Sequence, residues 1–344
     1  MGSLAVCLRR VWILLTAHQR RRRITEVAGV STKNRATGSA KAITADLVAV
    51  LVAVTDGEPK IMTIANDSAL PSGPFEFAHR SLQTGLRAWV EAQTGHPLGY
   101  VEQLYTFADR GRAGDAKSPH SISISYLGLT REDKVGQGFE AHWSGWYEYF
   151  PWEDQRAGLP PSLAKTLASR LRAWAKSADT TSVQRERWQR AAITFGLDDR
   201  EWNEELVLQR YELLYEAGLI PEAVRDGAPA TAVIPGKPMT GDHRRILATG
   251  IARLRAKIKY RPVVFELMPA EFTLLQLQRS VEALAGRLVH KQNFRRLIEQ
   301  QQLVEETGAI AADTVGRPAK LFRFRHGVLA ERAIAGTKLP LSRT

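Results

Sequence analysis

Residues 265–308 contain two short amphipathic helical segments joined by a glycine-containing turn. In the first segment, Thr273 and Gln276 have the spacing of a capping box. Apolar side chains then recur every three or four residues and are expected to be buried: Leu274, Leu277, Val281 and Leu284. The second segment is expected to turn three apolar side chains inward: Phe294, Leu297 and Ile298. Two such helices with a short turn predict a helix-turn-helix.

The polar face of the second helix carries side chains that suit a DNA groove: Lys291, Gln292, Asn293, Arg295 and Arg296. Arginine and lysine pair with guanine edges or phosphates, and asparagine and glutamine pair with adenine edges. A Gly-Pro turn at Gly316–Pro318 and a basic strand then predict a β-hairpin wing. Arg317 and Lys320 at its tip would contact phosphates or the minor groove. The alternative is a small helical domain with a solvated basic face.

The charge balance favours a polyanionic partner. The formal charge is +12 and the pI is about 9.9, which points to nucleic acid first and an anionic membrane surface second. Cys7 is the single cysteine, so a disulfide framework and a cysteine-rich metal site are excluded, as is typical of a reducing cytoplasm. The histidines lack the spacing of a zinc site, and we expect no metal. Neither a dinucleotide fingerprint nor a nucleophile elbow occurs.

A chain of 344 residues is long enough for two domains after a short tail. Residues 1–42 are basic and lack sustained periodicity, so we expect a disordered tail. Its apolar run Val11–Ala17 is too short to span a bilayer, and basic residues rather than a cleavage site follow it. Two alternatives for residues 1–42 are a basic amphipathic membrane anchor and sequence that lies upstream of the true start codon.

The region after the tail predicts a mixture of strands and helices. Residues 43–65 predict two strands around the turn TDGEPK. A Pro/Gly loop then leads into an amphipathic helix within Leu70–Gly95, and residues 100–112 and Ser121–Thr130 predict two more strands. The aromatic cluster Trp143–Trp152 is either core or a wall for base stacking.

A long helical region separates these strands from the helix-turn-helix. Residues from Pro161 to about Arg225 have helical periodicity, and a Pro/Gly-rich loop follows. His243–Tyr260 then predicts a helix that connects two domains. Its apolar stripe consists of Ile246, Leu247, Ile251 and Leu254, with arginines and lysines flanking it.

The C-terminal block resembles the winged helix of the Nudix-related transcriptional regulators of NAD metabolism, the NrtR/NadQ type. The similarity is carried by four motifs in order: FTLLQLQ at 272–278, KQNFRR at 291–296, LVEETG at 303–308 and GRPAKLFRF at 316–324. This resemblance implies a Nudix-like sandwich ahead of the winged helix. The helical insertion at about 150–235 makes the chain most similar to the longer NadQ-type repressors.

The Nudix signature, G-x5-E-x7-R-E-U-x-E-E-x-G-U with U aliphatic, uses glutamates to hold Mg²⁺ against a diphosphate. When the alignment is anchored on Thr94–Gly95, Pro74, which follows Gly73, stands at the position of the first glycine, and Arg80 replaces the first glutamate. Ala88 and Trp89 replace the Arg-Glu pair. Ala92 and Gln93 replace the metal-binding glutamates. Without these carboxylates, hydrolysis by the family route is not expected. Arg80 would instead pair with a diphosphate directly.

By the same resemblance, Arg80 would share a nucleotide pocket with four residues after the Nudix helix: Tyr105, Phe107, Arg110 and Arg112. The aromatic rings would stack on a base and the arginines would bind phosphates. A structural role in the core is the alternative for each aromatic residue.

Together these observations predict an α+β protein with an N-terminal Nudix-like α/β/α sandwich and a C-terminal winged helix-turn-helix. The expected parts are the tail at 1–42, the sensing domain at 43–240, the connecting helix at 241–260 and the winged helix at 261–335. The resemblance implies a homodimeric repressor of NAD biosynthesis genes. It would bind double-stranded operator DNA under control of NAD, ADP-ribose or ATP, without a catalytic cofactor. The alternatives are an active Nudix pyrophosphohydrolase for ADP-ribose or NADH with an appended nucleic-acid module, and a basic RNA-binding protein.

Overall fold

The computed structural model describes residues 43–99, 101–108, 121–132, 138–229, 233–260, 263–311, 318–325 and 327. Arg110, Arg112 and Arg317, which the sequence assigns to ligand or DNA contacts, lie outside these ranges, as does the basic tail. Residues 41–344 form one compact unit. Within the described ranges, no helix combines the length and the apolar content needed to cross a bilayer.

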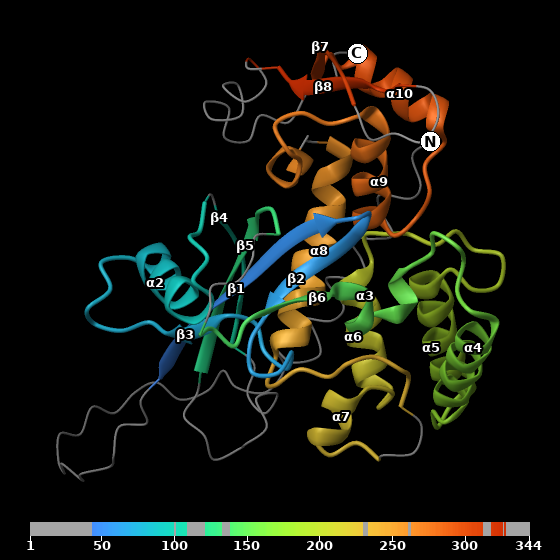
Figure 1. Cartoon of the computed structure of the whole chain (residues 1–344). Coiled ribbons are helices and arrows are strands. Elements are labelled where there is room, and N and C mark those ends of the chain that lie inside the picture. The colour runs from blue at the N-terminus through green and yellow to red at the C-terminus, as the bar shows by residue number, and fades with distance from the viewer. Residues whose placement is uncertain are drawn as a thin grey trace, which may run out of the picture. The chain divides into compact units, whose positions relative to one another are not determined.

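A mixed six-stranded sheet forms the first part of this unit (Figure 1). The strand order is β4-β5-β1-β2-β6, and the short β3 also pairs with β1. The bounds are β1 Thr44–Thr55, β2 Glu58–Thr63, β3 Ser72–Pro74, β4 Val101–Phe107, β5 Ser121–Leu129 and β6 His142–Gly145. β1 is parallel to β5 and antiparallel to β2 and β3. Asp56 and Gly57, with φ of 54° and 75°, form the tight turn between β1 and β2 that Asp-Gly sequences favour.

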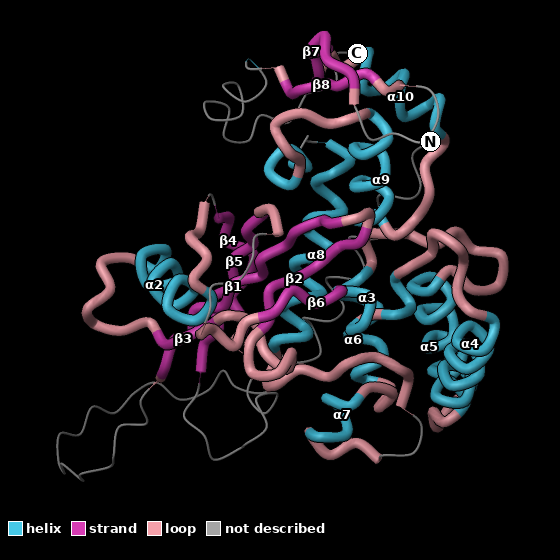
Figure 2. Tube along the Cα trace, viewed as in Figure 1, coloured by secondary structure: helices cyan, strands magenta, loops and turns pink. Residues whose placement is uncertain are grey.

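Helices cover both faces of the sheet, which explains why β1 is apolar at successive positions rather than at alternate ones. On one face, α2 (Leu82–Thr94) packs Leu86 and Val90 into a core with Leu47 and Leu51 of β1. On the other face, α8 (His243–Tyr260) crosses the strands (Figure 2). A side chain at Gly250 of α8 would come within 2.9 Å of the side chain of Val50, so the glycine allows α8 to approach β1 closely.

The region between β6 and α8 is helical, as the sequence predicts. The elements are α3 Trp146–Tyr149, the 3-10 turn η1 Pro151–Glu153, α4 Pro161–Lys176, α5 Thr181–Phe195, α6 Val207–Glu216 and α7 Pro221–Arg225. Trp146, Phe150 and Trp152 are fully buried, so this aromatic cluster is core and not a stacking wall. α6 begins only at Val207, although the sequence EWNEELVLQRYELLYEAGL has helical periodicity from Glu201 onward. The carbonyls of Asn203 and Glu204 instead accept hydrogen bonds from buried arginines.

The C-terminal part is a winged helix. It consists of η2 Val263–Leu267, α9 Leu274–Ala285, α10 Lys291–Gln300 and the antiparallel hairpin of β7 Val304–Ile310 with β8 Lys320–Phe324. Phe272 exchanges two backbone hydrogen bonds of 2.9 and 2.8 Å with Phe322 of the wing. The expected α+β architecture, a helix–sheet–helix sandwich followed by a winged helix-turn-helix, is confirmed.

The predicted apolar stripes are mostly correct. All four stripe residues of α8 are buried, as are Leu277 and Leu284 of α9, whereas Leu274 and Val281 are half-buried. In α10, Phe294 and Ile298 are buried, but the prediction for Leu297 is wrong because its side chain is 49% exposed. α10 buries a narrow stripe with a spacing of four residues, and Leu297 lies beside this stripe.

Candidate functional site

The exposed face of α10 is the first candidate site. Burial of Phe294 and Ile298 turns the remaining helix surface outward, and the five predicted DNA contacts are all exposed: Lys291, Gln292, Asn293, Arg295 and Arg296. No ion pair or side-chain hydrogen bond joins these five to another described residue. Their donors and charges are therefore available to an external polyanion.

The scaffold under α10 is held by local hydrogen bonds. The capping box of α9 is formed as predicted, because Thr273 Oγ1 accepts from Gln276 N at 3.2 Å and Gln276 Oε1 accepts from Thr273 N at 2.7 Å. Gly286, with φ of 72°, ends α9 in the left-handed conformation. The chain can thus turn from α9 into α10 within a few residues.

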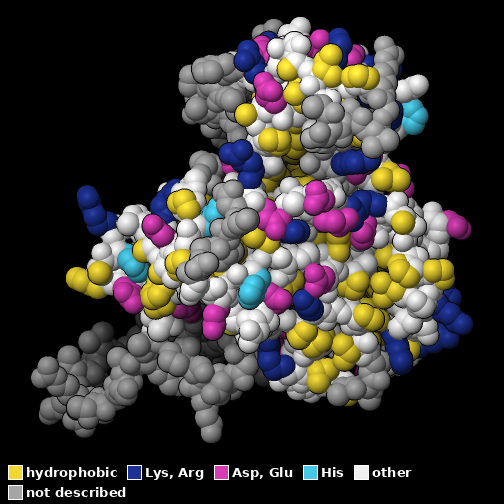
Figure 3. All heavy atoms as spheres, viewed as in Figure 1, with side chains coloured by type: hydrophobic (Ala, Val, Ile, Leu, Met, Phe, Trp, Pro, Cys, Tyr) yellow, Lys and Arg dark blue, Asp and Glu magenta, His cyan; other side chains and the backbone are white. Residues whose placement is uncertain are grey.

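The described part of the wing carries cations that are already paired. Lys320 Nζ lies 2.9 Å from both carboxylate oxygens of Glu306, and Arg323 Nε lies 2.7 Å from Glu305 Oε1. Lys320 remains exposed, so it can still reach a phosphate if its pair with Glu306 opens. Figure 3 shows lysine and arginine side chains spread over the visible face of the molecule among acidic ones, and not gathered in one patch.

The loop before α2 is the second candidate site. Ser81 caps α2, its Oγ accepting from Thr84 N at 3.1 Å, and Gly95 with φ of 67° ends the helix. Arg80 directly precedes the cap, is exposed, and has no ion pair or side-chain hydrogen bond with another described residue. Its guanidinium is therefore free to bind an anion.

Two of the Nudix signature positions have structural partners. Gln93 Oε1 accepts from Ser72 N at 3.0 Å, and Gln93 Nε2 donates to Ser72 O at 2.8 Å. Trp89 Nε1 donates to Pro74 O at 2.9 Å, and its ring covers Gly73 so closely that no side chain fits there. These two residues fasten β3 to α2. Among the described residues, no group of three or more His, Cys, Asp or Glu side chains could hold a metal ion.

The described members of the expected nucleotide pocket differ in burial. Tyr105 and Phe107 lie in contact, with ring centroids 4.9 Å apart. Phe107, however, is only 4% exposed, belongs to the core on the α8 face, and has Arg245 over its ring at 4.8 Å. Arg80 precedes α2, which covers the opposite face. The assignment of Phe107 to a ligand is therefore corrected to a core role, and Tyr105, 59% exposed, stays accessible.

Two hollows lie elsewhere. One, of about 360 Å³, is lined by residues including Pro221, Arg225 and Met239. The other, of about 400 Å³, is lined by residues including Arg131, Phe265 and Arg323. Neither contains Arg80 or Tyr105.

Sequence reasoning missed a set of buried charges. Arg210, Arg244 and Arg255 are at most 1% exposed, and their carboxylate partners Glu153 and Glu222 are equally buried. Arg244 Nη1 lies 3.0 Å from Glu222 Oε2, and Arg244 Nε donates to Tyr149 O at 3.1 Å. The sequence pattern could have indicated that these arginines are buried, because the helical spacing of α8 places Arg244 and Arg255 along its apolar stripe.

One histidine at the start of α8 is held neutral. His243 Nδ1 accepts a hydrogen bond from Leu70 N at 2.9 Å, which ties α8 to the segment before β3. Burial lowers the pKa of His243 from 6.5 to about 4, and the charge of Asp46 offsets only part of this shift. The ring therefore acts as an acceptor and not as a cation at neutral pH.

Comparison with known proteins adds an independent result. Residues 264–324 match the family model described as the NrtR DNA-binding winged helix domain. Residues 264–324 are thus similar to the NrtR DNA-binding winged helix domain. The resemblance read from the four C-terminal motifs is confirmed, and α9, α10 and the wing lie inside the matched NrtR range.

A curated relative also matches. The "ADPR responsive transcriptional repressor NtrR" of Acinetobacter baylyi is 40% identical over 85 residues. This match covers 24% of the present chain and 33% of the relative. The chain thus spans about a third of the length of the curated relative that it matches.

Two solved structures are similar as well. The Shewanella oneidensis NrtR complexed with a 27mer DNA is 19% identical, with a TM-score of 0.49, and covers 83% of this chain and 95% of that chain. The NUDIX domain of the same NrtR complexed with ADP ribose is 20% identical, with a TM-score of 0.28, and covers 33% of this chain and 80% of that chain.

Proposed function

We propose that the chain is a transcriptional repressor whose winged helix binds double-stranded operator DNA. The observation that carries this proposal is the exposed, unpaired polar face of α10 within a domain of the NrtR DNA-binding family. Arg295 and Arg296 would pair with base edges or phosphates, and Lys291, Gln292 and Asn293 would complete the contact. Arg317 and Lys320 would add phosphate contacts from the wing.

We further propose that the N-terminal sandwich, residues 43–240, is a sensor for an NAD-related nucleotide. ADP-ribose is the first choice over NAD or ATP, because the curated relative is described as ADPR responsive. Arg80 would bind the diphosphate, with Tyr105, Arg110 and Arg112 as further predicted contacts. The connecting helix at 241–260 would join this sensor to the winged helix at 261–335.

The target genes and the assembly are also proposals. A repressor of NAD biosynthesis genes would close a feedback loop on the nucleotide that it senses. A homodimer on a palindrome would place two recognition helices on two half-sites. A DNA partner would also fit the reducing cytoplasm that the single cysteine favours.

The rival function is Nudix hydrolysis. It is disfavoured because Gln93 and Trp89 hold β3 at positions where the signature requires carboxylates, and Mg²⁺ prefers hard oxygen ligands. Incubation of the full chain with ADP-ribose or NADH and Mg²⁺ should give no turnover above background. Mg²⁺-dependent release of a nucleoside monophosphate would establish the rival instead.

DNA binding is tested by selecting duplexes from a random-sequence pool with the full chain. Fluorescence anisotropy then compares the wild type with Arg295→Ala/Arg296→Ala. We expect the variant to lose about 100-fold or more in affinity, since each base-directed arginine contributes about 1–3 kcal/mol. The matched control, Lys165→Ala/Arg170→Ala, removes two exposed cations of α4, which lies outside the winged helix. It should change the affinity for DNA little.

Equal losses in the two variants would show that overall charge, and not α10, attracts the DNA. A preference for single-stranded RNA over every selected duplex would favour the RNA-binding alternative.

A further inference from the structure

The last turn of α9 is capped by groups from outside the winged helix. The final carbonyls of a helix have no partner within it. Here Tyr147 Oη donates to Ala283 O at 2.6 Å, Arg255 Nε donates to Leu284 O at 2.9 Å, and Gln155 N donates to Gly286 O at 2.7 Å. Tyr147 lies on α3, Gln155 lies at the start of the insertion, and Arg255 lies on α8.

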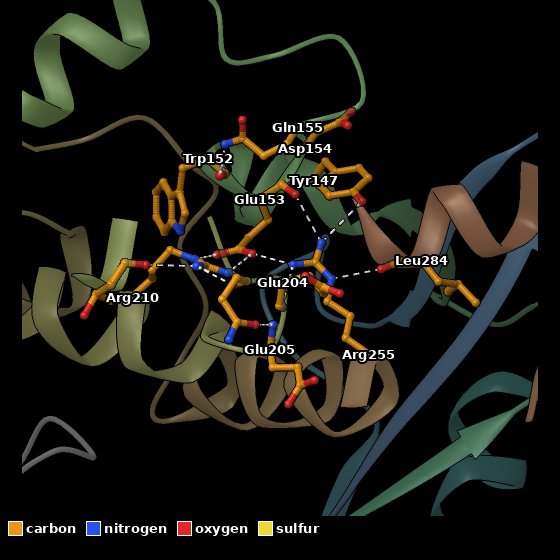
Figure 4. A network of polar contacts seen from close by, with 12 residues as sticks. Tyr147, Trp152, Glu153, Asp154, Gln155, Glu204, Glu205, Arg210, Arg255 and Leu284 are labelled. Atoms are coloured by element: carbon orange, nitrogen blue, oxygen red, sulfur yellow. Dashed lines mark hydrogen bonds and ion pairs between the residues drawn. The ribbon is translucent and has the colours of Figure 1, made fainter. Parts of the chain in front are cut away.

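The arginine in this cap is itself held by the insertion (Figure 4). Glu153 Oε2 accepts from Arg255 Nη1 at 2.5 Å and from Arg210 Nη2 at 2.8 Å, so one carboxylate joins α8 to α6. Arg255 also donates to the carbonyls of Glu153 at 3.1 Å and Glu204 at 3.2 Å. A cation beside helix carbonyls is favourable, and its burial makes the geometry specific.

Gly286 is required at the centre of this cap. Its φ of 72° suits glycine, and an added Cβ would lie 2.4 Å from Glu153 O and 2.5 Å from Arg255 Nη2. The end of α9 therefore sits directly against the insertion and α8, without space for a side chain.

The position of α10 follows from the end of α9. Glu282 Oε1 accepts from Gln278 Nε2 and from Val289 N, both at 3.0 Å, which fastens the turn to α9. α10 starts two residues after Val289 and packs Phe294 and Ile298 into the core. A shift of the last turn of α9 would therefore shift α10.

We propose that α3, the start of the insertion and α8 together position α10 by capping the last turn of α9, with Tyr147 and Arg255 as positioning residues. Where the proposed function holds, this α9 cap is the junction through which a change in the sandwich reaches the DNA-binding face. The proposal assigns a role to the insertion, whose sequence alone indicates none.

Tyr147→Phe tests the α9 cap without leaving a buried charge unpaired, as Glu153→Gln or Arg255→Met would. Hydrogen exchange of the full chain, followed by mass spectrometry, measures the opening of residues 286–298. We expect their exchange to accelerate about fivefold or more, because the variant loses the hydrogen bond to Ala283 O and the acceptor of Arg255 Nη2 at 3.4 Å. The matched control is Tyr149→Phe, because Tyr149 lies on the same short helix and donates to Asp67 O at 2.8 Å. It should accelerate exchange at residues 65–69 and leave 286–298 unchanged.

The α9 cap would have no positioning role if Tyr147→Phe left the exchange of 286–298 at the wild-type rate, or if both variants accelerated it equally. A second readout uses a duplex selected by the wild type. We expect Tyr147→Phe to bind it about fivefold more weakly and to bind ADP-ribose as the wild type does. If the exchange pattern is as expected but the wild type binds no duplex, the positioning role stands and the proposed function fails.

Discussion

At the residue scale, two of the Nudix signature positions on α2 have a structural role, because their side chains bind the backbone of β3. Gln93 both donates to and accepts from the backbone of Ser72. An ionised glutamate has no donor and could form only one of these two bonds. Trp89 likewise uses its indole N–H to hold Pro74. Trp89 and Gln93, which stand at glutamate positions of the signature, therefore have their own partners on β3.

Arg80 gives a direct residue-scale test, because its exposed side chain has no partner among the described residues that its removal could disturb. We expect Arg80→Ala to fold normally and to weaken ADP-ribose binding about tenfold or more, as loss of a charge-assisted contact predicts. Isothermal titration calorimetry measures this. Arg170→Ala, another exposed arginine, should titrate as the wild type does. Unchanged binding in Arg80→Ala would remove this residue from the pocket.

Residue roles were harder to predict than elements. The exposure of the α10 polar face follows from helical periodicity and was predicted. Periodicity did not reveal that a bulge in β4 and the packing of α8 place Phe107 in the core. The burial of the three arginines was also not predicted, because the sequence shows a charged residue but not the carboxylate that pairs with it from a distant segment.

At the element scale, most of the fold was predictable because local patterns determine it. The Asp-Gly hairpin, the cap and glycine end of α2, the capping box of α9 and the stripe of α8 all follow from short-range rules. The start of α6 did not, because the carbonyl of Glu204 accepts a long-range hydrogen bond from Arg255 of α8, and the carbonyl of Asn203 accepts one from the side chain of Arg210. Tertiary hydrogen bonds decided that boundary.

The start of α8 supplies an element-scale prediction. The unfolded chain takes up a proton on His243 near pH 6.5, whereas the folded chain keeps it neutral down to about pH 4. The free energy of unfolding should therefore fall as the pH drops through this window, by up to about 1.4 kcal/mol per pH unit from this group. Above pH 6.5 the contribution is constant.

Urea unfolding between pH 7 and pH 4.5 measures this dependence. His243→Gln, whose amide oxygen can still accept from Leu70 N, should lack this component of the slope. The control His290→Gln, which changes an exposed histidine, should keep it. Parallel curves for wild type and His243→Gln would mean that another group produces the pH dependence.

At the scale of the whole molecule, one continuous core joins the sheet to the winged helix. Buried residues of β1, of the insertion, of α8 and of α9 and α10 belong to the same cluster. Sequence analysis expected two domains linked by a connecting helix, and it left the insertion without a role. The α9 cap joins α3, the start of the insertion and α8 to the end of α9. Packing of this kind depends on side chains distant in sequence, so periodicity could not indicate it.

The proposed function requires that nucleotide and DNA affect each other's affinity through this core. Because linkage is reciprocal, the factor by which ADP-ribose changes the Kd for a selected duplex must equal the factor by which the duplex changes the Kd for ADP-ribose. The decisive measurement is calorimetric titration of ADP-ribose into the full chain, alone and saturated with that duplex. We expect two different Kd values, separated by about fivefold or more. Identical Kd values, or no binding of ADP-ribose at all, would show that the chain is not an ADP-ribose-controlled repressor.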